Sequence, residues 1–480
     1  MTTETQRSCR GCNIHDLCVF VVFFVVAAAA SSLQQPPDQI AFYTDKQNLL
    51  VYLDSAGKPH PVKTAADWEI RRSHVIQSLQ LVMGRLPEPE TAGLDIQILA
   101  TEELGNVRRL KITFRSEGED RVPAFLLIPH WIRKGTKAPG ILCLHQTTPI
   151  GKAEPTGLGG KPNLHYALEL AERSFVTLAP DYPNSGDYKF DSYAHDYVSA
   201  TMKAIVNHRR AIDLLQSLPE VDPEKIAVIG HSLGGHNALF LAAFDRRVKA
   251  VVTSCGFTSF RKYMGGNLSG WSHKGYMPRI AEVYDKNPAR MPFDFTELLA
   301  CLAPRPVFIS APVDDSNFEV SGVRDCVAAA LPVYRRIYKA GRSLKVIYPP
   351  GGHDFPPKAR EAAYRFLAQI LHQRREISMS LDPSPLGAMN DEYLTAVFIR
   401  HSSFVILKEE LSNDSVGAGC ADRIYVGTSL SVHVALRAGL RNGLLVGTRA
   451  AAHRGRGDLL QSVDATYTGR VGGPQSCPIL

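Results

Sequence analysis

Three residues of this 480-residue chain have the types and the order needed to activate a serine hydroxyl. The run GHSLG at 230–234 fits the pattern G-x-S-x-G around Ser232, after an apolar segment and before a helical one. Strand, sharp turn and helix form the context in which this pattern presents a nucleophilic serine above a sheet. A serine hydroxyl also needs a base and an orienting carboxylate, which follow as Asp314-Asp315 and then His353. We therefore expect Ser232 to be the nucleophile and His353 the base.

Two adjacent carboxylates compete for the role of the acid. Both follow the strand-like run PVFIS, and the spacing from Asp315 to Phe318 suits a loop that a hydrophobic residue anchors three positions on. Asp315 is therefore the expected acid, and Asp314 stays open as the alternative. His353 lies in the sequence GGHDF, where two glycines allow the loop to bring the imidazole toward Ser232.

The reaction of a serine with a carbonyl also needs hydrogen-bond donors for the oxyanion. One expected donor is the backbone N–H of Leu233, the first residue after the nucleophile. The second is expected from the loop LHQTT after a buried strand, through the main chain of Gln146 or Thr147.

These residues need a scaffold, and the hydrophobic periodicity predicts one. A helical pattern spans 68–86, strand-like segments follow between 94 and 128, and strands then alternate with helices as far as a last amphipathic helix at 359–371. Such alternation indicates an α/β fold with a mainly parallel sheet. An aromatic-rich insertion at 256–300 is equally consistent with a cap over the substrate pocket and with a small aromatic core.

At several of these positions the chain resembles the α/β-hydrolase superfamily, in particular the dienelactone-hydrolase-like, acetyl-xylan-esterase-like and prolyl-oligopeptidase-type catalytic domains. The resemblance covers about residues 68–371 and rests on the segments FLLIP, LHQT, IAVIGHSLGG, ISAPVDDSNF and PPGGHDF. It implies a doubly wound, mainly parallel, eight-stranded sheet with helices on both faces and a small cap insertion, a triad of Ser232, Asp315 and His353, and ester hydrolysis through an acyl-enzyme. The chain departs from the pattern at Gln146, where many relatives carry glycine. It also lacks the cysteine nucleophile of true dienelactone hydrolases and the propeller of the oligopeptidases.

The composition suits a soluble enzyme and gives a provisional division of the chain. Hydrophobic residues make up 45% and charged residues 21%, with a net charge of +7 but no basic run with interleaved aromatics, so no nucleic-acid partner is expected. Residues 1–30 resemble a signal peptide or a short anchor, since Arg7 and Arg10 precede the apolar run 17–30. We expect a secreted or periplasmic protein without stable membrane insertion after removal of this leader. An exposed lead-in at 31–64, a catalytic domain at 65–375 and a poorly ordered or non-native extension at 376–480 complete the division.

The cysteines and histidines predict neither a metal site nor a cofactor. Cys9, Cys12 and Cys18 lie in the leader without a matching second pair of ligands, and no H-E-x-x-H motif is present. Cys301 and Cys326 could form a disulfide in an oxidising compartment, a question that the sequence leaves open.

The expected activity is that of a serine hydrolase cleaving carboxylic esters with small acyl groups, such as acetyl esters of carbohydrates. The expected partner is therefore a small-molecule or carbohydrate ester, and the oligomeric state is left open. A serine peptidase or amidase with the same triad and a non-catalytic binding protein on a hydrolase fold are the alternatives. Paired ester and amide substrates distinguish the esterase from a peptidase or amidase. Labelling by a fluorophosphonate distinguishes it from a non-catalytic binding protein.

Overall fold

The computed structural model describes residues 41–132, 135–372, 393–400 and 403–410. The chain divides into two compact units, Met1–Ser378 and Met379–Leu480. The leader at 1–30 and most of the extension at 376–480 lie outside the described residues. Among those that are described, no helix is both long and apolar enough to cross a membrane.

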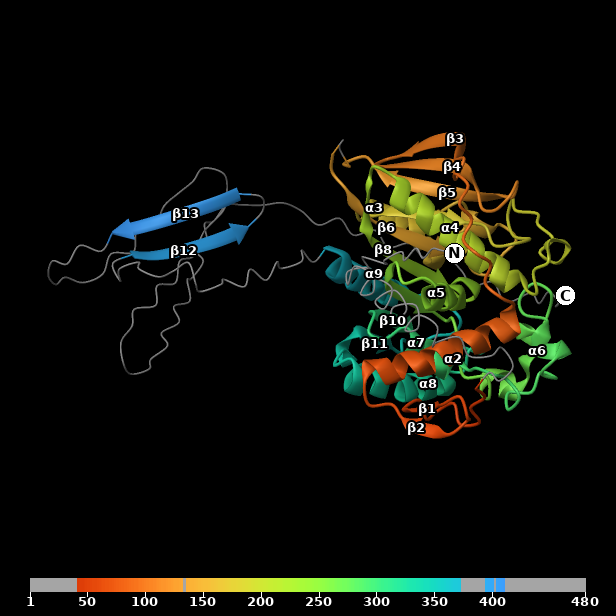
Figure 1. Cartoon of the computed structure of the whole chain (residues 1–480). Helices are drawn as coiled ribbons and strands as arrows, with labels where there is room; N and C mark the ends of the chain where they lie inside the picture. Colours follow the sequence, from red (N-terminus) through yellow and green to blue (C-terminus); the bar gives the residue numbers. More distant parts are fainter. Residues whose placement is uncertain (1–40, 133–134, 373–392, 401–402, 411–480) are drawn as a thin grey trace, which may run out of the picture. The chain divides into compact units, whose positions relative to one another are not determined.

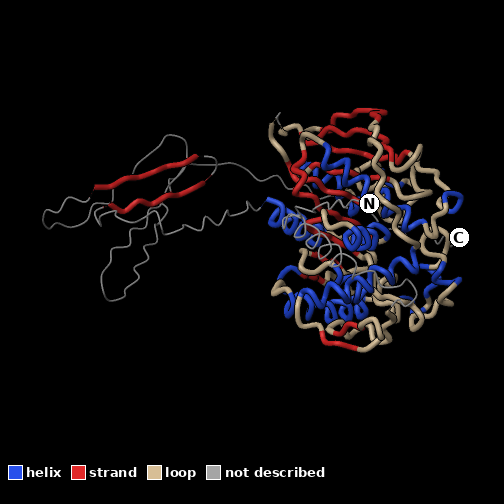
Figure 2. The backbone as a smooth tube through the Cα atoms, viewed as in Figure 1, coloured by secondary structure: helices blue, strands red, loops and turns tan. Residues whose placement is uncertain are grey.

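A nine-stranded sheet forms the centre of the first unit (Figures 1 and 2). Its strands are β3 (Gln97–Leu104), β4 (Val107–Arg115), β5 (Arg121–Pro129), β6 (Ala138–Leu144), β7 (Val176–Pro180), β8 (Val221–His231), β9 (Val248–Ser254), β10 (Val307–Ser310) and β11 (Leu344–Ile347). Their order is β11-β10-β9-β8-β6-β7-β5-β4-β3, with parallel pairing from β11 to β7 and antiparallel pairing from β7 to β3. The expected mainly parallel sheet is therefore present, but the expected number of eight strands is wrong by one. The antiparallel end consists of β5, β4 and β3, and β3 pairs with β4 along almost its whole length.

Helices cover both faces of this sheet. They are α2 (Ala65–Met83), α3 (Tyr166–Glu172), α4 (Ala200–Ser217), α5 (Leu233–Phe244), α6 (Arg279–Glu282), α7 (Phe295–Cys301), α8 (Val320–Pro332) and α9 (Pro357–His372). Successive residues of a strand point to opposite faces. In β8, accordingly, Ala227 and Ile229 pack with α3 and α9, whereas Ile226 and Val228 belong to the larger cluster that contains α4, α5 and α7.

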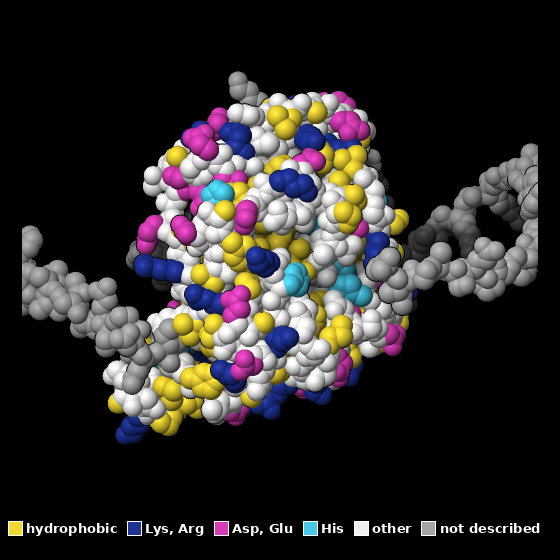
Figure 3. Space-filling view, turned by 90° about the vertical axis from the view of Figure 1, so that its right-hand side faces the viewer, with side chains coloured by type: hydrophobic (Ala, Val, Ile, Leu, Met, Phe, Trp, Pro, Cys, Tyr) yellow, Lys and Arg dark blue, Asp and Glu magenta, His cyan; other side chains and the backbone are white. Residues whose placement is uncertain are grey.

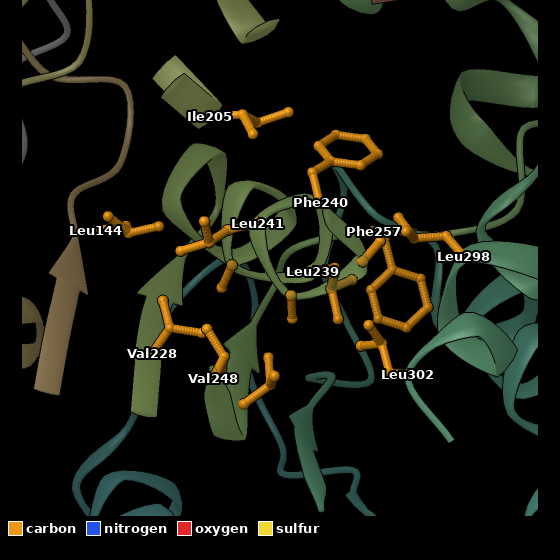
Figure 4. Packing of buried hydrophobic residues seen from close by; sticks show 14 of the residues in the cluster. Leu144, Ile205, Val228, Leu239, Phe240, Leu241, Val248, Phe257, Leu298 and Leu302 are labelled. Atoms are coloured by element: carbon orange, nitrogen blue, oxygen red, sulfur yellow. The ribbon is translucent and has the colours of Figure 1, made fainter. Parts of the chain in front are cut away.

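Helix α5 lies at the heart of the larger cluster. Every residue from Leu233 to Ala243 is buried, as expected for a helix enclosed on all sides rather than amphipathic. Figure 4 shows Leu239, Phe240 and Leu241 of this helix among side chains from β8, α4 and α7. The helix that follows the nucleophile is thus fixed by packing around its whole circumference.

Most of the lead-in that the structure describes is exposed or half-buried, but a few of its side chains reach the core. Residues 41–64 contain a two-stranded hairpin, β1 (Val51–Leu53) and β2 (Pro59–Pro61), and Tyr43, Leu49 and Val62 are buried. Tyr43 is held from α2, because its hydroxyl lies 2.9 Å from His74 Nδ1 and its ring lies under the guanidinium of Arg71. The lead-in is therefore anchored to the core by these buried side chains, while the residues between them are mostly exposed or half-buried.

The insertion at 256–300 contributes to the main core rather than forming a separate one. It contains the 3-10 turns η4 (Tyr263–Gly266) and η5 (Leu268–Trp271) as well as α6 and α7. Phe257, Phe260 and Trp271 are fully or almost fully buried in the cluster that surrounds α5. Arg71 of α2 and Glu297 of α7 form a buried ion pair of 2.6 Å, which ties the insertion to the first helix.

The second unit is described only over a hairpin. Strands β12 (Tyr393–Arg400) and β13 (Ser403–Glu410) pair antiparallel, with Tyr393 opposite Glu410. This hairpin was not predicted from the sequence of the extension.

Candidate active site

Ser232 occupies a strained turn between β8 and α5. Its φ of 53° and ψ of −117° lie in a region that residues with a side chain rarely adopt. The turn is possible only with glycine on both sides, because a Cβ on Gly230 would lie 2.2 Å from the carbonyl oxygen of Gly234. A Cβ on Gly234 would in turn lie 1.8 Å from the carbonyl oxygen of Leu144. The nucleophile turn is therefore packed directly against the end of β6.

His353 links the serine to a carboxylate. Its Nε2 lies 2.9 Å from Ser232 Oγ, and its Nδ1 lies 3.0 Å from each carboxylate oxygen of Asp315. The three residues follow β8, β10 and β11, so the carboxyl ends of three parallel strands bring them together. This continuous chain of hydrogen bonds is the geometry that general-base activation of a serine requires. The catalytic roles of the three residues stay a prediction.

The two candidate acids occupy different environments. Asp315 is buried, and its Oδ1 accepts hydrogen bonds from the backbone N–H groups of Asn317 and Phe318 at 2.8 and 3.0 Å. Burial alone would raise the pKa of Asp315, but the hydrogen bond and charge of His353, together with these N–H groups, lower its pKa below the ordinary value. Asp314 is exposed and accepts the N–H of Gly351 at 3.3 Å. Only Asp315 contacts the imidazole.

The expected oxyanion donors lie around the same turn. The N–H groups of Leu233, Gln146 and Thr147 have no acceptor among the described residues, which leaves them available for a ligand. The side-chain amide of Gln146 is not available, because its Nε2 donates to Glu154 Oε1 at 3.0 Å. Gln146 can therefore contribute only through its main chain. Which of Gln146 and Thr147 donates stays open.

The insertion reaches this loop through Tyr276. Its hydroxyl lies 2.6 Å from Thr147 Oγ1, and its ring packs edge-on against His236 of α5. Trp271 packs on the same histidine, with ring centroids 4.7 Å apart. Burial lowers the pKa of His236 to about 3, so this ring is neutral at physiological pH. The aromatic insertion thus contributes both to the core and to the border of the site.

Two residues close to the His353 imidazole, His231 and Cys255, were not predicted from the sequence as part of the site. The ring of His231 lies 4.9 Å from that of His353, and the Cys255 thiol lies 3.3 Å from the carbonyl oxygen of Asp354. Burial, followed by the charge of His353, lowers the pKa of His231 well below its usual value. The only signal in the sequence was their position at the ends of β8 and β9. Cys301 and Cys326 are free buried thiols here, so the disulfide considered above is not formed.

Comparison with known proteins shows that the chain is similar to several esterases. A family model described as "Glucuronyl esterase, fungi" matches residues 183–338, a segment that includes Ser232 and Asp315 and ends before His353. YtaP of Bacillus subtilis is 25% identical over 60% of this chain and 96% of its own length. Carbohydrate esterase MZ0003, from an unknown prokaryotic organism, is 28% identical over 28% of this chain and only 33% of its own length. Among solved structures, a glucuronoyl esterase from Solibacter usitatus superposes with a TM-score of 0.54 at 18% identity, covering 68% of this chain and 98% of that one. The fold is the one shared by α/β-hydrolases.

Proposed function

We propose that this chain, a carboxylic ester hydrolase of the α/β-hydrolase superfamily, cleaves carbohydrate esters through an acyl-enzyme formed on Ser232. The observation that carries the proposal is the unbroken series of hydrogen bonds from Ser232 through His353 to Asp315. Each member lies at the carboxyl end of a parallel strand, which is where doubly wound sheets bind their ligands.

The chemistry follows from the distances. Ser232 Oγ attacks the ester carbonyl carbon while its proton passes to His353 Nε2, 2.9 Å away. Asp315 holds Nδ1–H and stabilises the imidazolium that forms. The developing oxyanion accepts hydrogen bonds from the N–H of Leu233 and from that of Gln146 or Thr147. His353 then gives its proton to the leaving alcohol, and a water molecule releases the acid by the same steps in reverse order.

The family match supports a carbohydrate substrate, in which the sugar can be either the alcohol part or the acid part of the ester. In an acetylated sugar the carbohydrate is the leaving alcohol, and the acyl group left on Ser232 is small. In an ester of a uronic acid, the class that the matched family's description names, the sugar itself is the acyl group. The two cases place the sugar on opposite sides of Ser232 and are separable by substrate assays.

The molecular surface is compatible with an acidic polysaccharide. The net charge is +7, and Figure 3 shows Lys and Arg side chains interspersed with Asp, Glu, His and hydrophobic side chains on the face toward which α6 lies in Figure 1. A basic surface attracts polymers that carry free carboxylates beside the ester to be cleaved.

Purified protein assayed on p-nitrophenyl acetate, acetylated xylan and benzyl glucuronate tests the proposal. Hydrolysis of at least one ester, abolished by Ser232→Ala, is expected. Turnover that survives the loss of the hydroxyl contradicts the mechanism. Matched anilides test the peptidase alternative, and a fluorophosphonate that fails to label the wild type favours the non-catalytic alternative.

Two assignments outside the described residues are part of the proposal. We propose that residues 1–30 direct export, which N-terminal sequencing of protein secreted by a host cell tests. We also propose that residues 376–480 are dispensable for catalysis. A chain ending at Arg375 should remain soluble and active, and a truncated chain without soluble, active enzyme contradicts this.

A further inference from the structure

Three side chains of metal-ligating types, one of them His353 itself, meet beside Ser232. His231, Cys255 and His353 each offer one ligand atom, and these atoms all lie within 4.8 Å of one another. They come from the ends of β8, β9 and β11, so no local sequence motif connects them. The parallel register of β8 and β9 places His231 beside Ser254 and thereby beside Cys255.

His231 has an unused ring nitrogen. The side chain is completely buried, its Nδ1 lies 3.1 Å from Ser254 Oγ, and its Nε2 has no hydrogen-bond partner among the described residues. Buried polar atoms are nearly always paired, so an unpaired imidazole nitrogen next to a thiol requires an explanation. A neutral imidazole with a free lone pair is a metal ligand.

Cys255 is held in place by its backbone. Its φ of 46° is left-handed, and the next residue is Gly256, where a Cβ would lie 2.2 Å from Thr253 Oγ1. The thiol is 3% exposed and forms no disulfide. The sulfur of Cys255 lies within 4.8 Å of a nitrogen of each of the two imidazoles. Access from solvent comes through His353, whose side chain is 22% exposed.

We propose that His231, Cys255 and His353 form a binding site for a thiophilic divalent cation, with Zn²⁺ as the reference ion, and that its binding switches off hydrolysis. Two nitrogens and one sulfur make up a ligand set that zinc prefers, with a fourth position left to solvent. The inhibitory part rests on the proposed role of His353 as base, whereas the binding itself does not.

The step balances without any co-reactant. Zn²⁺ displaces one proton from the Cys255 thiol to solvent, and each neutral imidazole gives one lone pair. If His353 binds through Nε2, it no longer accepts the proton of Ser232. If it binds through Nδ1, it gives up its hydrogen bond to Asp315. Metal–ligand bonds of about 2.0–2.3 Å require the three donors to draw slightly closer, which a small rotation of the loop-borne imidazole provides.

The test uses the full chain and a matched pair of cysteine variants. Zn²⁺ is added during ester hydrolysis and removed with a chelator. Wild-type activity should fall and then recover. For Cys255→Ala, half-inhibition relative to the variant's own rate without Zn²⁺ should need at least tenfold more Zn²⁺. Cys143→Ala, which removes another fully buried thiol outside the cluster, should behave as the wild type.

Calorimetry with Zn²⁺ supplies a readout independent of activity. The number of Zn²⁺ ions bound per chain should be one lower in Cys255→Ala than in the wild type. Any Zn²⁺ bound by the leader cysteines is the same in both proteins and leaves this difference unchanged. His231→Gln should show the same drop, which keeps the test decisive if one variant fails to fold. Equal stoichiometry and equal inhibition in wild type and variants overturn the proposal. A zinc site lost in the variants of a protein without esterase activity leaves the site standing and refutes the proposed function instead.

Discussion

Replacing Asp315 by asparagine tests the arrangement of the site most sharply, because the substitution keeps the shape of the side chain and the loop. Oδ1 of Asp315 accepts two backbone N–H groups, from Asn317 and Phe318. The amide oxygen of an asparagine can keep both. Its NH₂ group must then take the place of Oδ2, 3.0 Å from His353 Nδ1.

An amide donor at that point changes which nitrogen of the His353 imidazole carries the proton. Nδ1 becomes the acceptor, the proton moves to Nε2, and Nε2 can no longer accept the proton of Ser232. In serine triads this tautomer error lowers kcat by about 10⁴-fold, equivalent to about 5 kcal/mol of transition-state stabilisation. We therefore expect Asp315→Asn to reduce kcat on p-nitrophenyl acetate by about that factor, with KM little changed.

The adjacent residue supplies the control. Asp314 is exposed and contacts only the backbone of the Gly351 loop, so Asp314→Asn should change kcat/KM by no more than about twofold. Steady-state kinetics and circular dichroism on both variants measure activity and folding together. The reasoning is refuted if Asp315→Asn stays within tenfold of the wild type, or if Asp314→Asn is the variant that loses activity.

Further predictions concern the turn, the insertion and stability. Gly234→Ala should abolish activity and lower the melting temperature in a thermal scan, because its Cβ would overlap the carbonyl oxygen of Leu144; a fully active variant contradicts this. Tyr276→Phe should lower kcat/KM about 3- to 10-fold by removing one hydrogen bond to the oxyanion loop, and unchanged kinetics would rule that link out. Burial raises the folded-state pKa of Glu297 from its ordinary value of 4.5 to about 7, despite the Arg71 beside it. Because the native state then binds more protons than the unfolded state, the free energy of unfolding should fall between about pH 4.5 and pH 7, by up to about 3 kcal/mol from this group. Urea unfolding should show a flatter pH dependence in Glu297→Gln, and equal slopes refute the assignment.

The parts of the site that could be predicted are those with short-range signals. Ser232 lies in the five-residue motif GHSLG between a strand and a helix, and Asp315 and His353 each follow a recognisable apolar strand. Since parallel strands end at one edge of the sheet, the position of each residue along its own strand was enough to bring them together. The preference for Asp315 over Asp314 rested on its distance to Phe318, and the structure indeed records a hydrogen bond between these two residues.

The features that escaped prediction depend on contacts between distant segments. Tyr43 is buried because His74 and Arg71 of α2 enclose it, and nothing within the lead-in itself indicates this. His231 and Cys255 are neighbours only through the register of β8 against β9, which local sequence does not specify. Hydrophobic periodicity reports which face of an element is covered but not which side chains it meets.

The strand order determines the sequence in which the residues of the site are synthesised and assembled on the ribosome. From β8 the sheet extends outward through β9, β10 and β11 in the order of synthesis, each new strand pairing with the one just made. Ser232 is therefore translated first, Asp315 next and His353 last, on the outermost strand of that side. With Ser232 and His353 in their proposed roles, every nascent form that ends before His353 carries the nucleophile without its base, and hydrolysis begins only after β11 has joined the sheet.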